Sequence, residues 1–161
     1  MQTTQAPPSV MPNSFSDEAK AFIQQVFKRR IRGEVSQYRA RYTKCVAHQV
    51  AHGPNSYMVN ELKRSRRLLT MVIHLHNRNK EGYEKYKAKV RDYELDYLEA
   101  LREGDGDECM TILNVDSGTL EEHTNSEGVR LQGDIAVQTG KYIDWLDKMA
   151  EGCAWWAWRK E

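Results

Sequence analysis

Residues 16–56 read SDEAKAFIQQVFKRRIRGEVSQYRARYTKCVAHQVAHGPNS and contain one long amphipathic pattern followed by an abrupt stop. Ser16 is a good N-cap, and Asp17 and Glu18 place two acids in the first turn, where they complement the helix dipole. Apolar or small residues then recur at helical spacing from Ala19 to Val50, across Gly33. The pattern predicts one helix of about 55 Å, with a bend at Gly33 as an option, that ends before Gly53-Pro54.

A second apolar stripe follows the Gly-Pro turn and runs from Met58 to Leu101. Between Asn77 and Gly82 it crosses residues that form helices poorly, so we expect a bend or a short break there. The apolar spacing after Gly82 is close to heptad, which favours a coiled-coil-like seam. The two stripes predict a mainly α protein built on a long antiparallel helical hairpin over residues 16–103.

The segments on either side of the predicted hairpin differ from it. Residues 1–15 carry three prolines among polar residues, so we expect an extended N-terminal arm. Residues 104–161 predict a small acidic C-terminal unit, all-helical or α+β, in which Lys141 to Ala150 is helical. Met110 to Val115 resembles a short strand, but residues 109–138 as a whole stay open between strands and helix. A faint helix-turn-helix spacing around Gly140 is a weaker alternative, because the helix that would enter the major groove is acidic.

Charge is distributed unevenly along the chain, although its net value is only +1. Residues 1–103 contain 19 Lys and Arg against 11 Asp and Glu, which leaves +8, whereas residues 104–161 contain 5 against 12, which leaves −7. A basic front half predicts a polyanion as its partner. Pairing of the two halves with each other, or with other copies of the chain, is the alternative.

The basic residues fall in clusters that the hairpin would place side by side. If the chain folds back at Pro54, the numbers of facing residues sum to about 108, so basic clusters on one arm meet basic clusters on the other, with Arg78 and Lys80 opposite the first cluster. Like charges held together cost stability unless something negative lies between them, and phosphates are the obvious candidates. Solvated faces and acidic protein surfaces are the alternatives. The predicted nucleic-acid-binding residues are Lys28, Arg29, Arg30, Arg32, Arg39, Arg41, Lys63, Arg64, Arg66 and Arg67.

Three tryptophans gather near the C-terminus, at Trp155, Trp156 and Trp158. Tryptophans in such a cluster are hard to solvate, so they should dock on something. We predict a protein interface, since tryptophan is enriched at interface hot spots. Covering the chain's own hairpin and insertion at a membrane surface are the alternatives.

Histidines and cysteines give no convincing metal or cofactor site. Cys45, His48 and His52 share a helical face, but Cys45 and His52 lie about 10 Å apart along the axis and no fourth ligand is evident. His74 and His76 point to different faces of a helix and make no common site. We therefore predict no metal and no cofactor.

Three widely spaced cysteines do not form a disulfide framework, which favours a reducing compartment such as the cytosol, the nucleus or a virion interior. No apolar run approaches the length of a transmembrane helix.

The sequence also lacks a phosphate-binding glycine loop, a nucleophile elbow and a paired-carboxylate pattern. We predict a non-enzymatic subunit of a larger assembly, self-associating or bound to other proteins through its termini, whose basic hairpin contacts nucleic acid or another polyanion. The alternative is a purely structural subunit of a virion or organelle complex, with no nucleic-acid contact.

Overall fold

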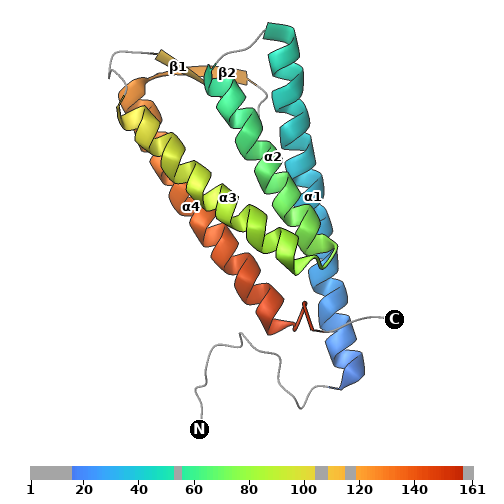
Figure 1. The fold of residues 1–161 in the computed structure, drawn as a ribbon. Coiled ribbons are helices and arrows are strands. Elements are labelled where there is room, and N and C mark those ends of the chain that lie inside the picture. Colours follow the sequence, from blue (N-terminus) through green and yellow to red (C-terminus); the bar gives the residue numbers. More distant parts are fainter. Residues whose placement is uncertain (1–15, 53–55, 104–108, 115–118, 158–161) are drawn as a thin grey trace.

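Four helices and one short β-hairpin make up the protein in the computed structural model, which describes residues 16–52, 56–103, 109–114 and 119–157 (Figure 1). The helices are α1 (Asp17–His52), α2 (Ser56–His76), α3 (Lys80–Arg102) and α4 (Asn125–Gly152). The strands β1 (Cys109–Asn114) and β2 (Thr119–Thr124) lie between α3 and α4 in the sequence. The mainly α prediction is confirmed, as is a small strand-and-helix part after residue 104.

Helix α1 begins where its capping signal places it. Ser16 Oγ accepts a hydrogen bond from the Ala19 amide at 3.0 Å, and Asp17 and Glu18 occupy the first turn. The helix runs unbroken for 36 residues through Gly33, where an added Cβ would meet open space. It packs lengthwise against α2, so the long antiparallel hairpin is confirmed (Figure 1).

The weak point at residues 77–79 is a full reversal of the chain. Arg78 has a left-handed backbone with a φ of 57°, and the Asn79 amide donates to the His74 carbonyl at 2.9 Å. Asn79 Oδ1 then accepts from the Gly82 amide at 3.0 Å, which caps the start of α3. The predicted break is confirmed, but α3 folds back along α2 instead of extending it (Figure 1).

The β-hairpin leads directly into α4. Cys109 pairs with Thr124 and Asn114 with Thr119 in an antiparallel register. Thr124 and Glu127 form a capping box: Thr124 Oγ1 accepts from the Glu127 amide, and the Glu127 carboxylate accepts from the Thr124 amide. From there α4 continues through Gly133 and Gly140, so the strand reading of residues 129–137 and the helix-turn-helix alternative are both wrong.

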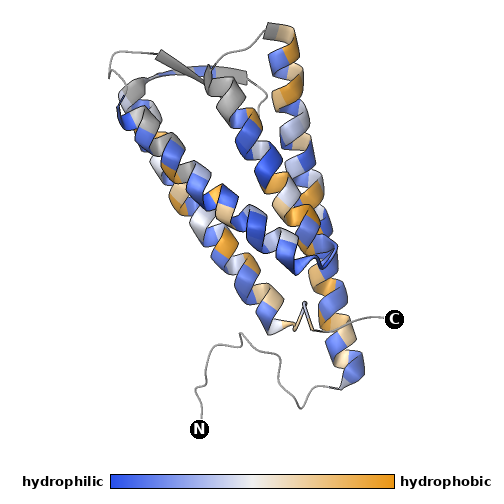
Figure 2. Ribbon diagram, in the orientation of Figure 1, coloured by the Kyte–Doolittle hydropathy of each residue, from blue (hydrophilic) through white to orange (hydrophobic). Residues whose placement is uncertain are grey.

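One hydrophobic core joins all four helices and the turn that follows α4. Its buried residues include Phe27 and Ile31 of α1, Leu75 of α2, Tyr83 of α3 and Leu146 of α4. The acidic C-terminal segment therefore supplies the fourth helix of a shared core. Each described helix carries hydrophilic residues along part of its surface (Figure 2), and none of the four is long and apolar enough to cross a membrane.

Trp155 belongs to this core and Trp156 packs against it, which corrects the assignment of these two tryptophans to a protein interface. Trp155 is completely buried, and its ring meets Phe27 edge-on at 5.1 Å and 87°. Its indole nitrogen donates to the Leu75 carbonyl at 2.8 Å. Trp156 is half-buried with its ring 5.5 Å from that of Tyr83, and Trp158 lies outside the described residues. Covering the chain's own helices, the alternative above, is what the structure shows for Trp155.

Candidate nucleic-acid interface

Positive charge is concentrated on the α1–α2 pair. These two helices carry 12 lysines and arginines against 4 acids, which leaves +8. Helix α3 has 6 of each, and α4 has 3 basic residues against 5 acids. Helix α3 belongs to the basic front half of the sequence but carries no net charge. The excess positive charge of that half therefore lies on α1 and α2, along one side of the bundle.

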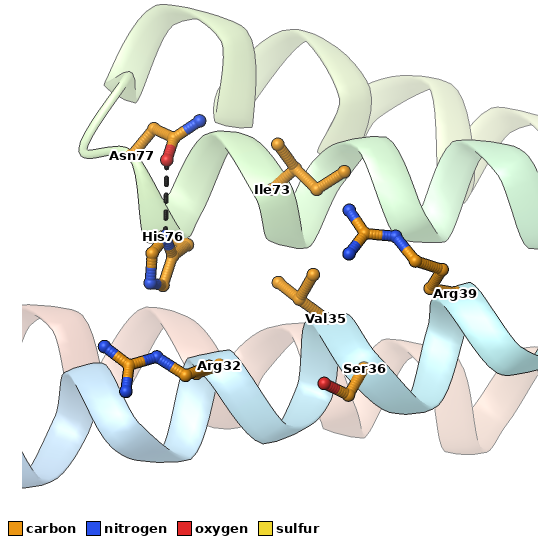
Figure 3. Close-up of a pocket in the computed structure, with 7 residues that line it drawn as sticks. All are labelled: Arg32, Val35, Ser36, Arg39, Ile73, His76 and Asn77. Atoms are coloured by element: carbon orange, nitrogen blue, oxygen red, sulfur yellow. Dashed lines mark hydrogen bonds between the residues drawn. The ribbon is translucent and has the colours of Figure 1, made fainter.

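A groove lies between α1 and α2 on this basic side (Figure 3). Its volume is about 330 Å³, and its described lining is Arg32, Val35, Ser36 and Arg39 from α1 with Ile73, His76 and Asn77 from α2. Val35 and Ile73 face each other in its middle, and the two exposed arginines stand on either side of them (Figure 3). None of these lining residues is acidic.

The groove confirms the pairing of facing residues between the two arms. Arg32 and His76, whose numbers sum to 108, line it together. Farther along the same helix pair, Cys45 Sγ lies 3.7 Å from Ser65 Oγ, and those numbers sum to 110. Arg32 and Arg39 are two helical turns apart, about 10.5 Å along the α1 axis. The fold thus presents two cationic side chains on one line.

Glu34 of α1 and Glu61 of α2 are both engaged away from the groove. Glu34 projects from the opposite side of α1, where its carboxylate accepts from the Tyr142 hydroxyl at 2.6 Å and lies 3.8 Å from Arg30. Glu61, the only acid of α2, is buried and forms an ion pair with Arg64. Neither carboxylate lines the groove, so the charge of Arg32 and Arg39 is not balanced there.

Arg64 is a correction to the predicted set of phosphate contacts. Its side chain is only 2% exposed, and its guanidinium donates to Gln132 Oε1 of α4 in addition to pairing with Glu61. Taking Arg64 out to the surface would leave Glu61 as an uncompensated buried charge, which costs several kcal/mol. Arg64 therefore holds α2 to α4 and is not part of the candidate surface.

The other predicted basic residues are spread around the two helices. Arg29, Arg30, Lys63 and Arg66 are exposed, while Lys28, Arg41 and Arg67 are half-buried. Stacking on aromatic rings holds two of them, since the guanidinium of Arg30 lies 4.7 Å from the Trp145 ring and that of Arg67 lies 4.8 Å from the Tyr93 ring. These ten residues consequently do not form a single patch.

Arg41 faces away from the groove toward α4. It lines a second cavity of about 210 Å³, together with Arg64, Tyr38 and Tyr142 among others. Burial raises the pKa of Tyr38, which the nearby charge of Arg41 partly offsets. Burial, together with Tyr38 and Glu34, raises the pKa of Tyr142 as well. Both hydroxyls therefore stay protonated well beyond neutral pH.

Arg78, expected opposite the first basic cluster, is used inside the molecule. Its guanidinium lies 4.0 Å from the Trp155 ring and donates to Gln24 Oε1 at 2.6 Å. Gln24 Nε2 in turn donates to the carbonyls of Cys153 and Ala154 at 2.6 and 2.9 Å. Burial lowers the pKa of Arg78 and raises that of the Cys153 thiol to about 11. This network fastens the α2–α3 turn to α1 and to the end of α4.

His76, Ser36 and Asn77 are groove residues that sequence reasoning missed. His74 and His76 face different sides of α2, as the sequence predicts. The His74 ring lies 5.5 Å from the Tyr86 ring of α3, whereas His76 lines the groove. Because the numbers of facing residues sum to about 108, His76 could have been expected opposite Arg32. Polar lining residues of this kind carry no signal of their own in the sequence.

Metal ligands do not gather at the groove or elsewhere in the described ranges, where no group of three or more His, Cys, Asp or Glu side chains is arranged to hold an ion. Cys45 is buried beside Ser65. Comparisons of the chain with family models, curated proteins and solved structures found no match.

Proposed function

We propose that the α1–α2 groove binds the phosphate backbone of a nucleic acid, and that the protein is a non-enzymatic binding subunit of a larger assembly. The observation that carries the proposal is a groove with exposed Arg32 and Arg39 and no acid among its described lining residues. Two like charges at one groove repel each other unless an anion lies between them.

A linear polyanion suits this surface better than a compact one. Arg32 and Arg39 lie two helical turns apart on α1, about 10.5 Å along the groove. Both are arginines, and a planar guanidinium donates two parallel hydrogen bonds to a phosphate. Regularly spaced phosphates along a strand would meet such a pair, whereas an acidic protein surface offers carboxylates without that regularity.

The salt dependence of binding tests this proposal. Fluorescence anisotropy of a labelled oligonucleotide, duplex or single-stranded, is measured from about 50 to 200 mM salt. Neutralising both groove arginines, in Arg32→Gln/Arg39→Gln, should reduce the log–log slope by about 1.8 for a duplex or about 1.4 for a single strand. Both side chains are exposed, so folding should be unaffected, which circular dichroism checks.

The matched control removes two charges from the other side of the bundle. Lys141→Gln/Lys148→Gln changes two exposed lysines of α4 and should leave the slope unchanged. Equal losses in both double variants would show a general effect of net charge and would remove the groove from the proposal. A protein that binds no oligonucleotide even at low salt would leave the structural subunit, with an acidic protein as its partner.

A further inference from the structure

We propose that the cavity between α1, α2 and α4 is a second binding site, for a small organic acid that carries one carboxylate on a short apolar body. The cavity has a volume of about 210 Å³, and its described lining shares no residue with the α1–α2 groove. Its ligand is a small molecule and not a nucleic acid, so the site is independent of the function proposed for the groove.

The cavity is open to solvent and suits a small ligand. Gln138 of α4 is exposed and Arg41 of α1 is half-buried, so these two residues mark its mouth. Leu68 of α2 is only 4% exposed and lies at its inner end. The volume far exceeds the roughly 10–15 Å³ that one water needs, but it is smaller than the roughly 300–1,000 Å³ of pockets for drug-sized ligands. A single ring or a short chain therefore matches the available space.

Arg41 gives the cavity one positive charge that no acid in the described part of the chain neutralises. None of the ion pairs formed there includes Arg41. The other arginine of the lining, Arg64, forms an ion pair with Glu61 and so adds no net charge. One carboxylate would balance Arg41, and the planar guanidinium can donate two parallel hydrogen bonds to it.

Glu34 limits the negative charge that a ligand can bring. Its carboxylate lies beside the cavity, where it accepts from the hydroxyl of the lining residue Tyr142 at 2.6 Å. Its ion pair with Arg30 is long, at 3.8 Å, and the Arg30 side chain is 62% exposed, so Glu34 stays only partly balanced. A doubly charged inorganic phosphate would meet twice the repulsion from this carboxylate that a monoanion meets. The site therefore favours a monocarboxylate.

The rest of the lining favours an apolar body on that carboxylate. Leu68 and Ile135 contribute apolar side chains from α2 and α4. The rings of Tyr38 and Tyr142 lie 5.8 Å apart, and burial raises the pKa of both hydroxyls, so neither adds a negative charge at neutral pH. An aromatic or branched body would cover these surfaces, and removing them from water contributes about 25 cal/mol per Å². An inorganic ion would leave them wet.

Sodium benzoate is the probe, because it joins one carboxylate to one ring. The intact ¹⁵N-labelled protein is titrated with benzoate at about pH 7 and constant ionic strength, and its amide signals are followed by NMR. The signals of residues 135–139 on α4 should shift and reach saturation. Arg41→Gln should weaken binding at least about tenfold, because it removes charge-assisted hydrogen bonds. Since Arg41 forms no ion pair in the described ranges, this variant should keep the fold, which its own spectrum checks.

Lys148→Gln is the matched control, because it removes one exposed positive charge of α4 outside the cavity lining. It should bind benzoate as the unmodified protein does. Benzamide, which has the shape of benzoate without the charge, should bind at least about tenfold more weakly, and inorganic phosphate should also bind more weakly.

Three outcomes would overturn the assignment of this site. The first is a dissociation constant for benzoate above about 10 mM in the unmodified protein. The second is an equal effect of Arg41→Gln and Lys148→Gln, which would show only a response to net charge. The third is an affinity for benzamide or phosphate as high as that for benzoate. None of the three bears on oligonucleotide binding at the α1–α2 groove.

Discussion

Replacement of Trp155 by alanine should be the most damaging single change in the C-terminal turn. The side chain is fully buried against Phe27 and lies under the guanidinium of Arg78 at 4.0 Å. Truncating a buried tryptophan to alanine costs about 3–5 kcal/mol through lost burial and the cavity left behind. Loss of the stacked cation adds about 1 kcal/mol. We expect Trp155→Ala to lower the free energy of unfolding by about 4–6 kcal/mol, a large share of the ~5–15 kcal/mol typical of a domain.

Two further variants separate packing from the indole hydrogen bond. Trp155→Phe keeps an aromatic ring but loses the donor to the Leu75 carbonyl, which still accepts from the Arg78 amide at 3.1 Å. That acceptor therefore stays satisfied, and the loss should be about 1–2 kcal/mol. Truncation after Gly152 removes Trp155 with the whole turn and should destabilise the protein at least as much as Trp155→Ala.

Urea denaturation followed by far-UV circular dichroism measures these differences. Phe22→Ala is the matched control, because Phe22 is an aromatic residue of α1 that is 65% exposed, and its truncation should cost less than about 0.5 kcal/mol. A Trp155→Ala variant or a truncated chain that unfolded with nearly the free energy of the intact protein would contradict this prediction. Trp155 would then be replaceable in the core.

Three further predictions concern the buried pair, the tyrosines and the α2–α3 turn. Arg64→Met should cost about 3–5 kcal/mol because it leaves Glu61 buried without its cation, and Glu61→Leu/Arg64→Met should recover most of that loss in urea titrations. Burial raises the pKa of Tyr38, Tyr83 and Tyr142 in the folded state, so the unfolded chain loses these phenolic protons first as the pH rises. Above about pH 10, the free energy of unfolding should therefore fall by about 1.4 kcal/mol per pH unit for each of these tyrosines. Unfolding measured at about pH 9 and about pH 11, together with phenolate absorbance, checks this. Gly82→Ala should destabilise the protein by about 1 kcal/mol or more, because the new Cβ would lie 2.6 Å from His74 Nδ1. Gly140→Ala, whose new Cβ would meet open space, should stabilise it by about 0.5–1 kcal/mol. An equal effect of the two substitutions on thermal unfolding would contradict this.

Local signals in the sequence were enough to predict α1 and the helix that pairs with it, α2. Ser16, the two acids after it and Gly53-Pro54 mark the ends of α1, because capping and helix termination depend on a few neighbouring residues. The register of the two helices was also accessible, since antiparallel helices joined by a short turn have little freedom to slide, and Arg32 and His76 line the groove together as numbers that sum to 108. The charge of the α1–α2 pair followed from composition alone.

The path of the chain after His76 was decided by tertiary packing. Asn77 to Gly82 mark a weak point in the helical pattern, but only the left-handed backbone of Arg78 and the burial of Tyr83 turn that point into a reversal. Helical periodicity continued across the gap because α3 also needs one apolar face, whichever direction it takes. The same ambiguity affected residues 129–137, where Gly133 and the nearby Gly140 left helix and strand both open, and the packing of α4 on α3 decides for helix.

The positions of individual charged and aromatic side chains were also decided only in three dimensions. Arg64 reads as one member of a basic cluster, yet it lies inside the bundle because Glu61 and Gln132 meet it there. Trp155 reads as an anchor for a partner, yet it meets Phe27, which lies 128 residues away along the chain. Periodicity shows which residues share a helix face, but a helix packed among several neighbours has more than one covered face. Which of those faces stays open to a phosphate, as at Arg32 and Arg39, therefore depends on the assembled bundle.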